Sequence, residues 1–336
     1  MNAYFDLPNI LSYIHSISPR NDDCERMLKE NFNVLLTFSK EDVLALDERE
    51  QDDFKLWLTG WMEGSKSRPS YDCCIPTKPY QFITLSSDKK TSSPFLSAYC
   101  CPVDLQTSET LLYASCGEEK AKLSSLFLDS FQFTEDIFFD INKWEDLNNF
   151  TSPCTDIIIV DQYILSSPEL YDSNLYKLIS ILASKSGDNK INIVIFTLKD
   201  NYDKRTNIKF IPDWDEIYTK IRKCCGGKSR PNVTFVTASK YMLQEHDRTI
   251  FTNYKLFSSG DTFNYFDSKG ERITNGRYFH YHSAARKKNL AKMIKFISDM
   301  QKVINHVHSR DKDLIIKNKK SNFLTFPEVV QIGCTE

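Results

Sequence analysis

The sequence has no long hydrophobic run. Its longest aliphatic stretches, such as IIIV at 157–160, are far shorter than the roughly 20 residues of a membrane-spanning helix. The opening residues, MNAYFDLPNILSYIHS, have neither the basic segment nor the apolar segment of a secretion signal. We therefore expect a soluble, cytoplasmic protein.

Cysteine patterns that hold zinc are also missing. The chain has 10 cysteines, but none stands in a CxxC or CxxH pattern, and six form adjacent pairs at 73–74, 100–101 and 224–225. Adjacent cysteines do not readily bond to each other, so free thiols in a reducing compartment are expected. The sequence therefore predicts no metal site and no cofactor. With only 10 glycines in 336 residues, collagen-like or linker-like character is excluded.

The chain has little net charge, but its charges are unevenly placed. The formal charge is −2, yet residues 1–53 carry 12 Asp or Glu against 5 Lys or Arg, and residues 277–320 carry 12 Lys or Arg against 3 Asp. These opposite fields indicate either attraction within the fold or between subunits, or a basic surface for an anionic partner. The 23 Phe and 16 Tyr exceed what a core of this size needs, so some are expected at a protein interface.

Apolar periodicity divides the chain into three parts. Residues 1–127 read as a smaller α+β region of unknown role, mostly helical up to residue 64, then strand-like in YQFITLSS and FLSAYCCPV, which are expected as a hairpin or two edge strands. The segment SETLLYASCGEEKAKLSSLFLDSF fits either a strand or a helix. Residues 128–310 form the main domain, and residues 311–336 read as a docked extended tail.

The main domain has the pattern of an α/β fold. The segments TDIIIVDQYIL, KINIVIFTL and NVTFVTA read as buried strands, separated by helices in DSNLYKLISILASKSG and DWDEIYTKIRKCCGG, the second ending at Gly226. This order predicts a parallel sheet with right-handed crossovers. Two antiparallel strands at about 246–252 and 254–258, a hairpin turning at 268–270 and a long helix over 283–308 follow. DNYDKRTNIKFIP is expected to be a polar loop.

Polar residues collect where these strands end. Asp161 and Tyr163 close the first buried strand, and His246 and Arg248 open a later antiparallel strand. An antiparallel strand begins where its parallel neighbour ends, so we expect these residues to share one edge of the sheet. In open α/β sheets, ligands bind at the carboxyl ends of the strands.

The segment HDRTIFTNYKLFSSGDTFNYF resembles a motif of the phospholipase D superfamily. That motif is His-x-Lys, four residues, Asp, six residues, then Gly-Ser-x-Asn. Here His246 and Arg248 are followed by four residues and Asn253, then by six residues and Gly260, with Asp261 and Asn264 after it. Together with DIIIVDQYIL upstream, this resembles the degenerate phospholipase D-like domain that follows some microtubule-interacting-and-trafficking domains, and related bacterial modules. The resemblance covers roughly residues 128–310.

The resemblance implies a mixed sheet flanked by helices and a role for each motif position. His246 keeps the nucleophile position, Arg248 replaces the lysine that neutralises phosphate, and Asn253 replaces the aspartate that orients the histidine. Asp261 replaces a small serine and brings negative charge to the site. No second motif is present, although active members need two, so the resemblance favours a non-catalytic or weakly active module that binds a phosphate-containing or acidic partner.

That partner is expected to be nucleic acid backbone, anionic lipid or an acidic protein segment. The residues expected to contact it, besides His246, Arg248 and Asn253, are Asp161, Tyr163, Ser259, Gly260, Arg286, Lys287 and Lys288. Two alternatives remain: a homodimeric, metal-independent phosphodiesterase or nuclease with His246 as nucleophile, and a structural protein-interaction subunit. A simpler interpretation also remains, in which His246 caps a strand, Arg248 pairs with Asp161 or Glu245, and Gly260 is a turn residue.

Overall fold

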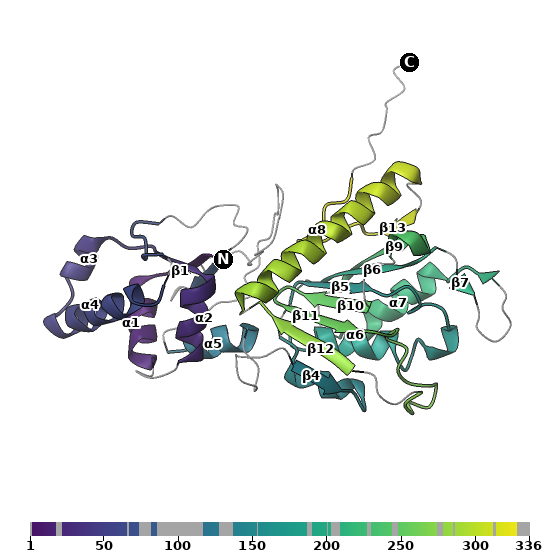
Figure 1. The fold of residues 1–336 in the computed structure, drawn as a ribbon, viewed down its shortest axis with the longest axis horizontal. Helices are drawn as coiled ribbons and strands as arrows, with labels where there is room; N and C mark the ends of the chain where they lie inside the picture. Colours follow the sequence, from purple (N-terminus) through teal and green to yellow (C-terminus); the bar gives the residue numbers. More distant parts are fainter. Residues whose placement is uncertain are drawn as a thin grey trace, which may run out of the picture.

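The computed structural model shows an N-terminal lobe, purple in Figure 1, beside a larger sheet domain coloured teal to yellow. The structure describes residues 2–17, 22–65, 67–73, 82–85, 117–127, 137–152, 154–186, 190–199, 201–202, 209–226, 230–243, 248–273, 278–284, 286–311 and 314–327. No helix in these ranges is both long enough and apolar enough to cross a membrane.

The N-terminal lobe contains a small parallel sheet packed with helices. In chain order its elements are β1 (Asn2–Phe5), α1 (Leu7–Ser16), α2 (Asp23–Asn31), β2 (Asn33–Leu36), α3 (Lys40–Leu44), α4 (Glu48–Met62), β3 (Phe82–Leu85) and α5 (Glu119–Phe127). Strand β1 lies between β2 and β3 and is parallel to both.

The expectation for this lobe was correct only in part. The prediction of a mostly helical start missed β1 and β2. In β2, NVLL continues the apolar spacing of the preceding helix in the sequence, although that helix ends at Asn31 and Phe32 is already extended. Strand β3, from YQFITLSS, pairs in parallel with β1, and FLSAYCCPV, its expected hairpin partner, lies outside the described residues. The segment that fitted either a strand or a helix contains helix α5.

The sheet domain has a mixed sheet with the strand order β13-β9-β6-β5-β10-β11-β12-β4. The strands are β4 (Ile137–Asp140), β5 (Asp156–Val160), β6 (Asn192–Leu198), β9 (Asn232–Ala238), β10 (Arg248–Thr252), β11 (Lys255–Ser259), β12 (Tyr278–Ser283) and β13 (Ile315–Lys317). Strands β5, β6 and β9 are parallel, and the other pairings are antiparallel. The predicted α/β fold is therefore confirmed.

Helices cover both faces of this sheet. Helices α6 (Leu175–Ala183) and α7 (Trp214–Cys224) pack on one face, and α8 (Lys287–Arg310) crosses the other (Figure 1). The 3-10 helices are η1 (Trp144–Asn149), η2 (Pro168–Leu170) and η3 (Lys240–Met242). The apolar side of α8 is buried at Met293, Ile297 and Met300. Gly226 follows α7 with a φ of 58°, as its predicted left-handed role requires.

Two details differ from the sequence prediction. The expected polar loop after β6 contains a short hairpin of β7 (Asn201–Tyr202) and β8 (Lys209–Phe210). The tail supplies β13, which pairs with β9, so residues 314–327 belong to the sheet domain. Beyond β13, Ser321 Oγ and the Asn322 amide both donate to Asp156 at the start of β5, at 2.7 and 2.8 Å.

Candidate functional site

The predicted edge exists at the carboxyl end of β5. Thr249 is opposite Val160 in the antiparallel β5–β10 pair, and Arg248 is opposite Ser259 in the β10–β11 pair. Asp161 follows Val160 directly, so Asp161 and Arg248 occupy the same end of neighbouring strands. We call this edge the rim and define it by Asp161, Tyr163, Arg248 and residues 259–264.

Asp161 holds the rim together. Its side chain is 1% exposed and accepts hydrogen bonds from Thr262 Oγ1 at 2.7 Å and the Phe263 amide at 2.7 Å. The Tyr163 amide donates to its other oxygen at 2.8 Å. Burial raises the pKa of Asp161, while these hydrogen bonds and the charge of Arg248 act in the opposite direction. The carboxylate therefore braces the loop after β11, and all three bonds come from that loop or its own turn.

Arg248 is the positive group of the rim. Its guanidinium carbon lies 5.8 Å from the centroid of the Tyr163 ring, and its Nε is buried without a hydrogen-bond partner. The simpler interpretation expected Arg248 to pair with Asp161 or Glu245. Among the described residues, Arg248 forms no ion pair with Asp161. The Tyr163 ring holds the Arg248 side chain in place, while the N–H donors of the guanidinium remain available to a ligand.

The loop after β11 completes the rim. Ser259 Oγ lies 2.6 Å from the Tyr265 hydroxyl and accepts from the Asp261 amide at 3.2 Å. Gly260 is exposed, and a Cβ added there would meet open space. The sequence interpretation missed Thr262 and Tyr265, because their contacts depend on how the loop folds back over Asp161. No spacing in the sequence indicated that return.

Asn253 lies at the other end of the sheet from Arg248. It occupies the turn after β10, and its Oδ1 accepts from the amides of Thr155 at 3.2 Å and Asp156 at 2.9 Å, at the start of β5. Its Nδ2 donates to Thr155 Oγ1 at 3.1 Å. Five residues of strand, at roughly 3.3 Å each, separate it from Arg248 by about 16 Å. The structure therefore does not bring Asn253 to the rim, and its contacts are structural.

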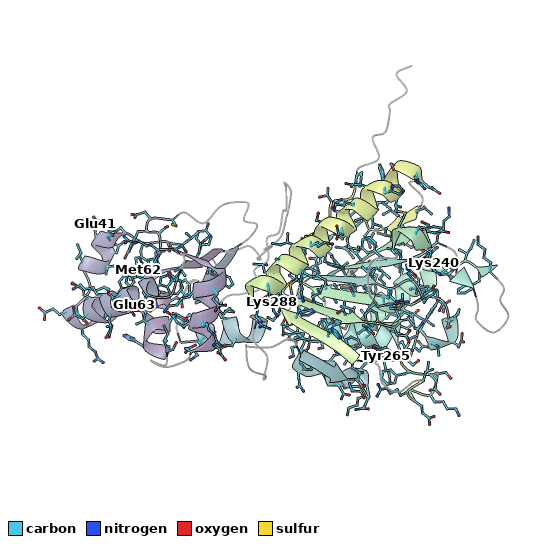
Figure 2. The ribbon with its side chains drawn as sticks, viewed as in Figure 1. Glu41, Met62, Glu63, Lys240, Tyr265 and Lys288 are labelled. Atoms are coloured by element: carbon cyan, nitrogen blue, oxygen red, sulfur yellow. The ribbon has the colours of Figure 1, made fainter. Side chains whose placement is uncertain are left out.

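The basic residues at the start of α8 are also distant from the rim. Strand β12 runs toward the Asn253 end, since Ser283 is opposite Lys255 and the Ala284 amide donates to Tyr254 O at 2.8 Å. Arg286 caps α8 just beyond this point. Figure 2 shows Lys288 at the opposite side of the domain from Lys240, which follows the carboxyl end of β9. The expectation that Arg286, Lys287 and Lys288 share a site with Arg248 is therefore wrong.

His246 lies outside the described residues, as does Glu245. The role of His246 as a nucleophile stays a prediction from the resemblance. Within the described part of the chain, no three His, Cys, Asp or Glu side chains converge in a way that would hold a metal ion.

The comparisons with known proteins identify no relative. No family model, no curated protein and no solved structure matches the chain. The chemistry of the rim must therefore be argued from its own residues.

Proposed function

We propose that the rim binds a phosphate group of an anionic partner through Arg248, and that the protein is a binding module of the phospholipase D-like type. The observation that carries this proposal is an arginine fixed at the carboxyl edge of an α/β sheet, half-buried over Tyr163, whose side chain makes no hydrogen bond to any described residue. A guanidinium presents its donors in a planar fork that matches two phosphate oxygens.

The surroundings of Arg248 favour a ligand over an internal partner. The Asp161 carboxylate already accepts three hydrogen bonds and forms no ion pair with Arg248, so it lowers the net charge of the rim without occupying the guanidinium. Arg222 provides a useful contrast, because it also lies over a tyrosine, 5.1 Å from the Tyr218 centroid, with a buried Nε that lacks a partner. Arg222 is on helix α7 and not at the carboxyl end of a parallel strand, so it controls for the effect of stacking alone.

Efficient catalysis is disfavoured by two features. In the motif that the chain resembles, an aspartate tunes the histidine, whereas Asn253 is used at the far end of the sheet to brace β5. Asp261, next to Gly260, places a carboxylate in the loop where a phosphate would bind. Like charge at this position opposes the approach of a phosphate and its transition state.

The test compares Arg248→Ala, Arg248→Lys and the matched control Arg222→Ala. Binding is measured by fluorescence anisotropy with a labelled single-stranded oligonucleotide, and by co-sedimentation with vesicles containing phosphatidylserine. Loss of charge-assisted hydrogen bonds should weaken binding by about tenfold or more in Arg248→Ala and less in Arg248→Lys. Wild-type binding should weaken as salt is raised, because phosphate contacts release counterions.

Equal binding by Arg248→Ala and Arg222→Ala would refute the proposal. The two probes separate nucleic acid from lipid as the source of the phosphate. The alternative of a homodimeric phosphodiesterase is checked on the same samples by light scattering and by incubating the oligonucleotide with EDTA. Cleavage by a dimer that disappears in His246→Asn would replace the binding proposal with that enzyme.

A further inference from the structure

The carboxyl edge of the sheet continues beyond the rim. Strand β6 lies beside β5, and β9 lies beside β6, with all three strands parallel. At their ends, the Leu198 amide donates to Gln162 O at 3.4 Å, and the Lys199 amide donates to Ala238 O at 2.9 Å. Neighbouring strands are about 4.8 Å apart, so the end of β9 lies roughly 14 Å from the start of β10 at Arg248. An extended ligand held at Arg248 can therefore reach the residues that follow β9.

The turn after β9 presents a lysine and a tyrosine to solvent. Lys240 and Tyr241 begin η3, and Tyr241 is 83% exposed, more than any other large apolar side chain in the described ranges. Neither side chain has a hydrogen bond, ion pair or ring contact with the described residues. Met242 packs against the core and Leu243 is fully buried, so the turn itself is anchored. Tyr241 is therefore an open aromatic surface on a fixed support.

Each end of this edge carries a cation and an aromatic ring. At the rim, the Arg248 guanidinium lies over Tyr163, and after β9 the cation Lys240 directly precedes Tyr241. A single strand of nucleic acid offers the complementary features, because each phosphate is linked to a base whose faces are free to stack. A lipid headgroup offers the phosphate without a planar ring. The pairing of cations with rings therefore favours a single strand over a lipid.

The charge along the edge also favours a ligand that stacks. Lys199 Nζ lies 3.5 Å from Asp311 Oδ2, Asp161 is buried in the rim, and Asp261 accepts from the Thr262 amide at 2.8 Å. These carboxylates offset much of the positive charge along the edge. Nonspecific binding to duplex DNA or to an anionic membrane depends on several clustered cations. A single strand gains affinity from stacking as well as from phosphate contacts, so it fits an edge with few cations.

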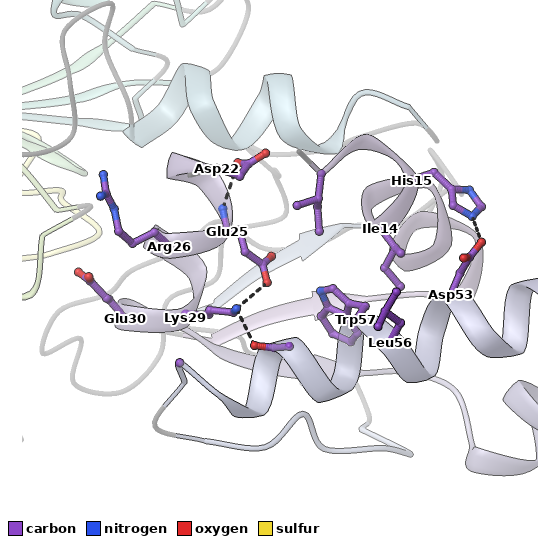
Figure 3. Close-up of a pocket in the computed structure, with 13 residues that line it drawn as sticks. Ile14, His15, Asp22, Glu25, Arg26, Lys29, Glu30, Asp53, Leu56 and Trp57 are labelled. Carbon is purple, nitrogen blue, oxygen red and sulfur yellow. Dashed lines mark hydrogen bonds and ion pairs between the residues drawn. The ribbon is translucent and has the colours of Figure 1, made fainter. Parts of the chain in front are cut away.

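The large cavity of the N-terminal lobe does not suit this ligand. It has a volume of about 650 Å³ and lies between α1, α2 and α4 (Figure 3). Its lining includes four carboxylates against two cationic side chains, namely Asp22, Glu25, Glu30, Asp53, Arg26 and Lys29. An excess of negative charge repels a phosphate backbone. The carboxyl edge of the sheet is therefore the better surface for a nucleic acid.

We propose that the ligand of the rim is a single-stranded nucleic acid, which crosses the carboxyl edge from Arg248 to Lys240 and stacks a base on Tyr241. Arg248 holds one phosphate and Lys240 holds another, while the Tyr241 ring provides the planar surface for the base. This inference rests on the proposed function, because Arg248 anchors the strand. It adds the class of ligand and a second region of contact.

The test compares two labelled single strands that differ only in their bases. One is a thymidine oligonucleotide, and the other is an abasic oligonucleotide of the same length with the same phosphates. Fluorescence anisotropy measures their binding to the wild type, Tyr241→Ala, Tyr241→Phe, Lys240→Ala and Arg248→Ala. Lys288→Ala replaces an exposed lysine at the opposite side of the domain (Figure 2) and is the matched control for Lys240→Ala. Circular dichroism confirms that each variant is folded.

The wild type should bind the thymidine strand about tenfold more tightly than the abasic strand, because only the thymidine strand can stack a base. Tyr241→Ala should abolish this preference, whereas Tyr241→Phe keeps the ring and should retain it. Lys240→Ala should weaken the binding of both strands by a similar factor, because it removes a phosphate contact, and Lys288→Ala should leave both affinities unchanged.

The inference is overturned if the wild type binds both strands equally, if Tyr241→Ala keeps the preference, or if Lys240→Ala binds as Lys288→Ala does. Binding to phosphatidylserine vesicles with no binding to either strand also overturns it. In each of these cases, weaker binding of the remaining probe by Arg248→Ala still supports the proposed function. Undiminished binding by Arg248→Ala refutes the proposed function itself, together with the path of the strand that depends on it.

Discussion

Replacing Asn253 tests whether this motif position is structural. The side chain is fully buried, its φ is 43°, and it makes three hydrogen bonds to Thr155 and Asp156 at the start of β5. Asn253→Gly keeps the left-handed backbone accessible but leaves two buried amides without an acceptor. Asn253→Ala also places a side chain with no compensating hydrogen bond in that backbone conformation.

The expected loss can be worked out from these contacts. Each orphaned buried amide costs about 1–3 kcal/mol, so Asn253→Gly, which orphans two, should lower the free energy of unfolding by roughly 2–6 kcal/mol. Alanine in the left-handed region adds about 1–2 kcal/mol, so Asn253→Ala should be the less stable variant. Urea unfolding of both variants and the wild type, followed by tryptophan fluorescence and circular dichroism, measures these differences.

Binding of the labelled oligonucleotide to the folded variants is the companion measurement. Because Asn253 lies about 16 Å from Arg248, its replacement should leave the affinity of the rim within about twofold of wild type under conditions where the variants are folded. Wild-type stability in both variants would refute the bracing role. Preserved stability together with lost binding would show that Asn253 contributes to the binding site, as the resemblance implied.

Three further predictions concern single side chains. Burial raises the pKa of Asp156 to about 6, so between pH 4 and pH 6 the native state binds more protons than the unfolded state. Wild-type stability should therefore fall as the pH rises. Calorimetry should show that this fall is about 3 kcal/mol larger in the wild type than in Asp156→Asn. Asp161→Asn should speed amide exchange at Tyr163 or at Phe263, because the NH₂ of asparagine must replace either the oxygen that accepts from Tyr163 or the oxygen that accepts from Thr262 and Phe263. Gly60→Ala should raise the thermal midpoint, as its Cβ meets no atom within 4 Å. The Asp156 prediction would be contradicted by an equal pH dependence of stability in the wild type and Asp156→Asn. Unchanged amide exchange would contradict the Asp161 prediction, and a lowered thermal midpoint would contradict the Gly60 prediction.

The sheet domain was predictable where local signals were strong. Strands β5, β6 and β9 are continuous apolar segments, and helices separate them, so their order fixes a parallel sheet with Asp161 at its carboxyl edge. The antiparallel start of β10 then places Arg248 beside it. Both conclusions need only strand direction, which the order of the elements along the chain determines.

The failures came from features that depend on how distant segments pack. Helix α8 begins at the end of the sheet where β12 finishes, so its basic start lies away from Arg248 although the sequence offers both as phosphate ligands. Strand β2 was hidden because its apolar residues continue the helical spacing of α2. The cavity between α1, α2 and α4 is lined by residues from separate segments of the chain, and no local pattern in the sequence indicates it.

The spacing that suggested the family resemblance has a direct structural explanation. The four residues after Arg248 complete β10, Asn253 begins the turn, and the six residues before Gly260 return along β11 to the edge where Arg248 lies. The pattern therefore describes a hairpin of two five-residue strands, and any such hairpin would keep Arg248 and Gly260 together and Asn253 apart. Spacing alone is thus weak evidence for phosphate chemistry. The evidence specific to this chain is the arginine that the hairpin delivers to the rim, where its side chain forms no hydrogen bond or ion pair with the described residues, which is why Arg248→Ala against Arg222→Ala is the decisive comparison.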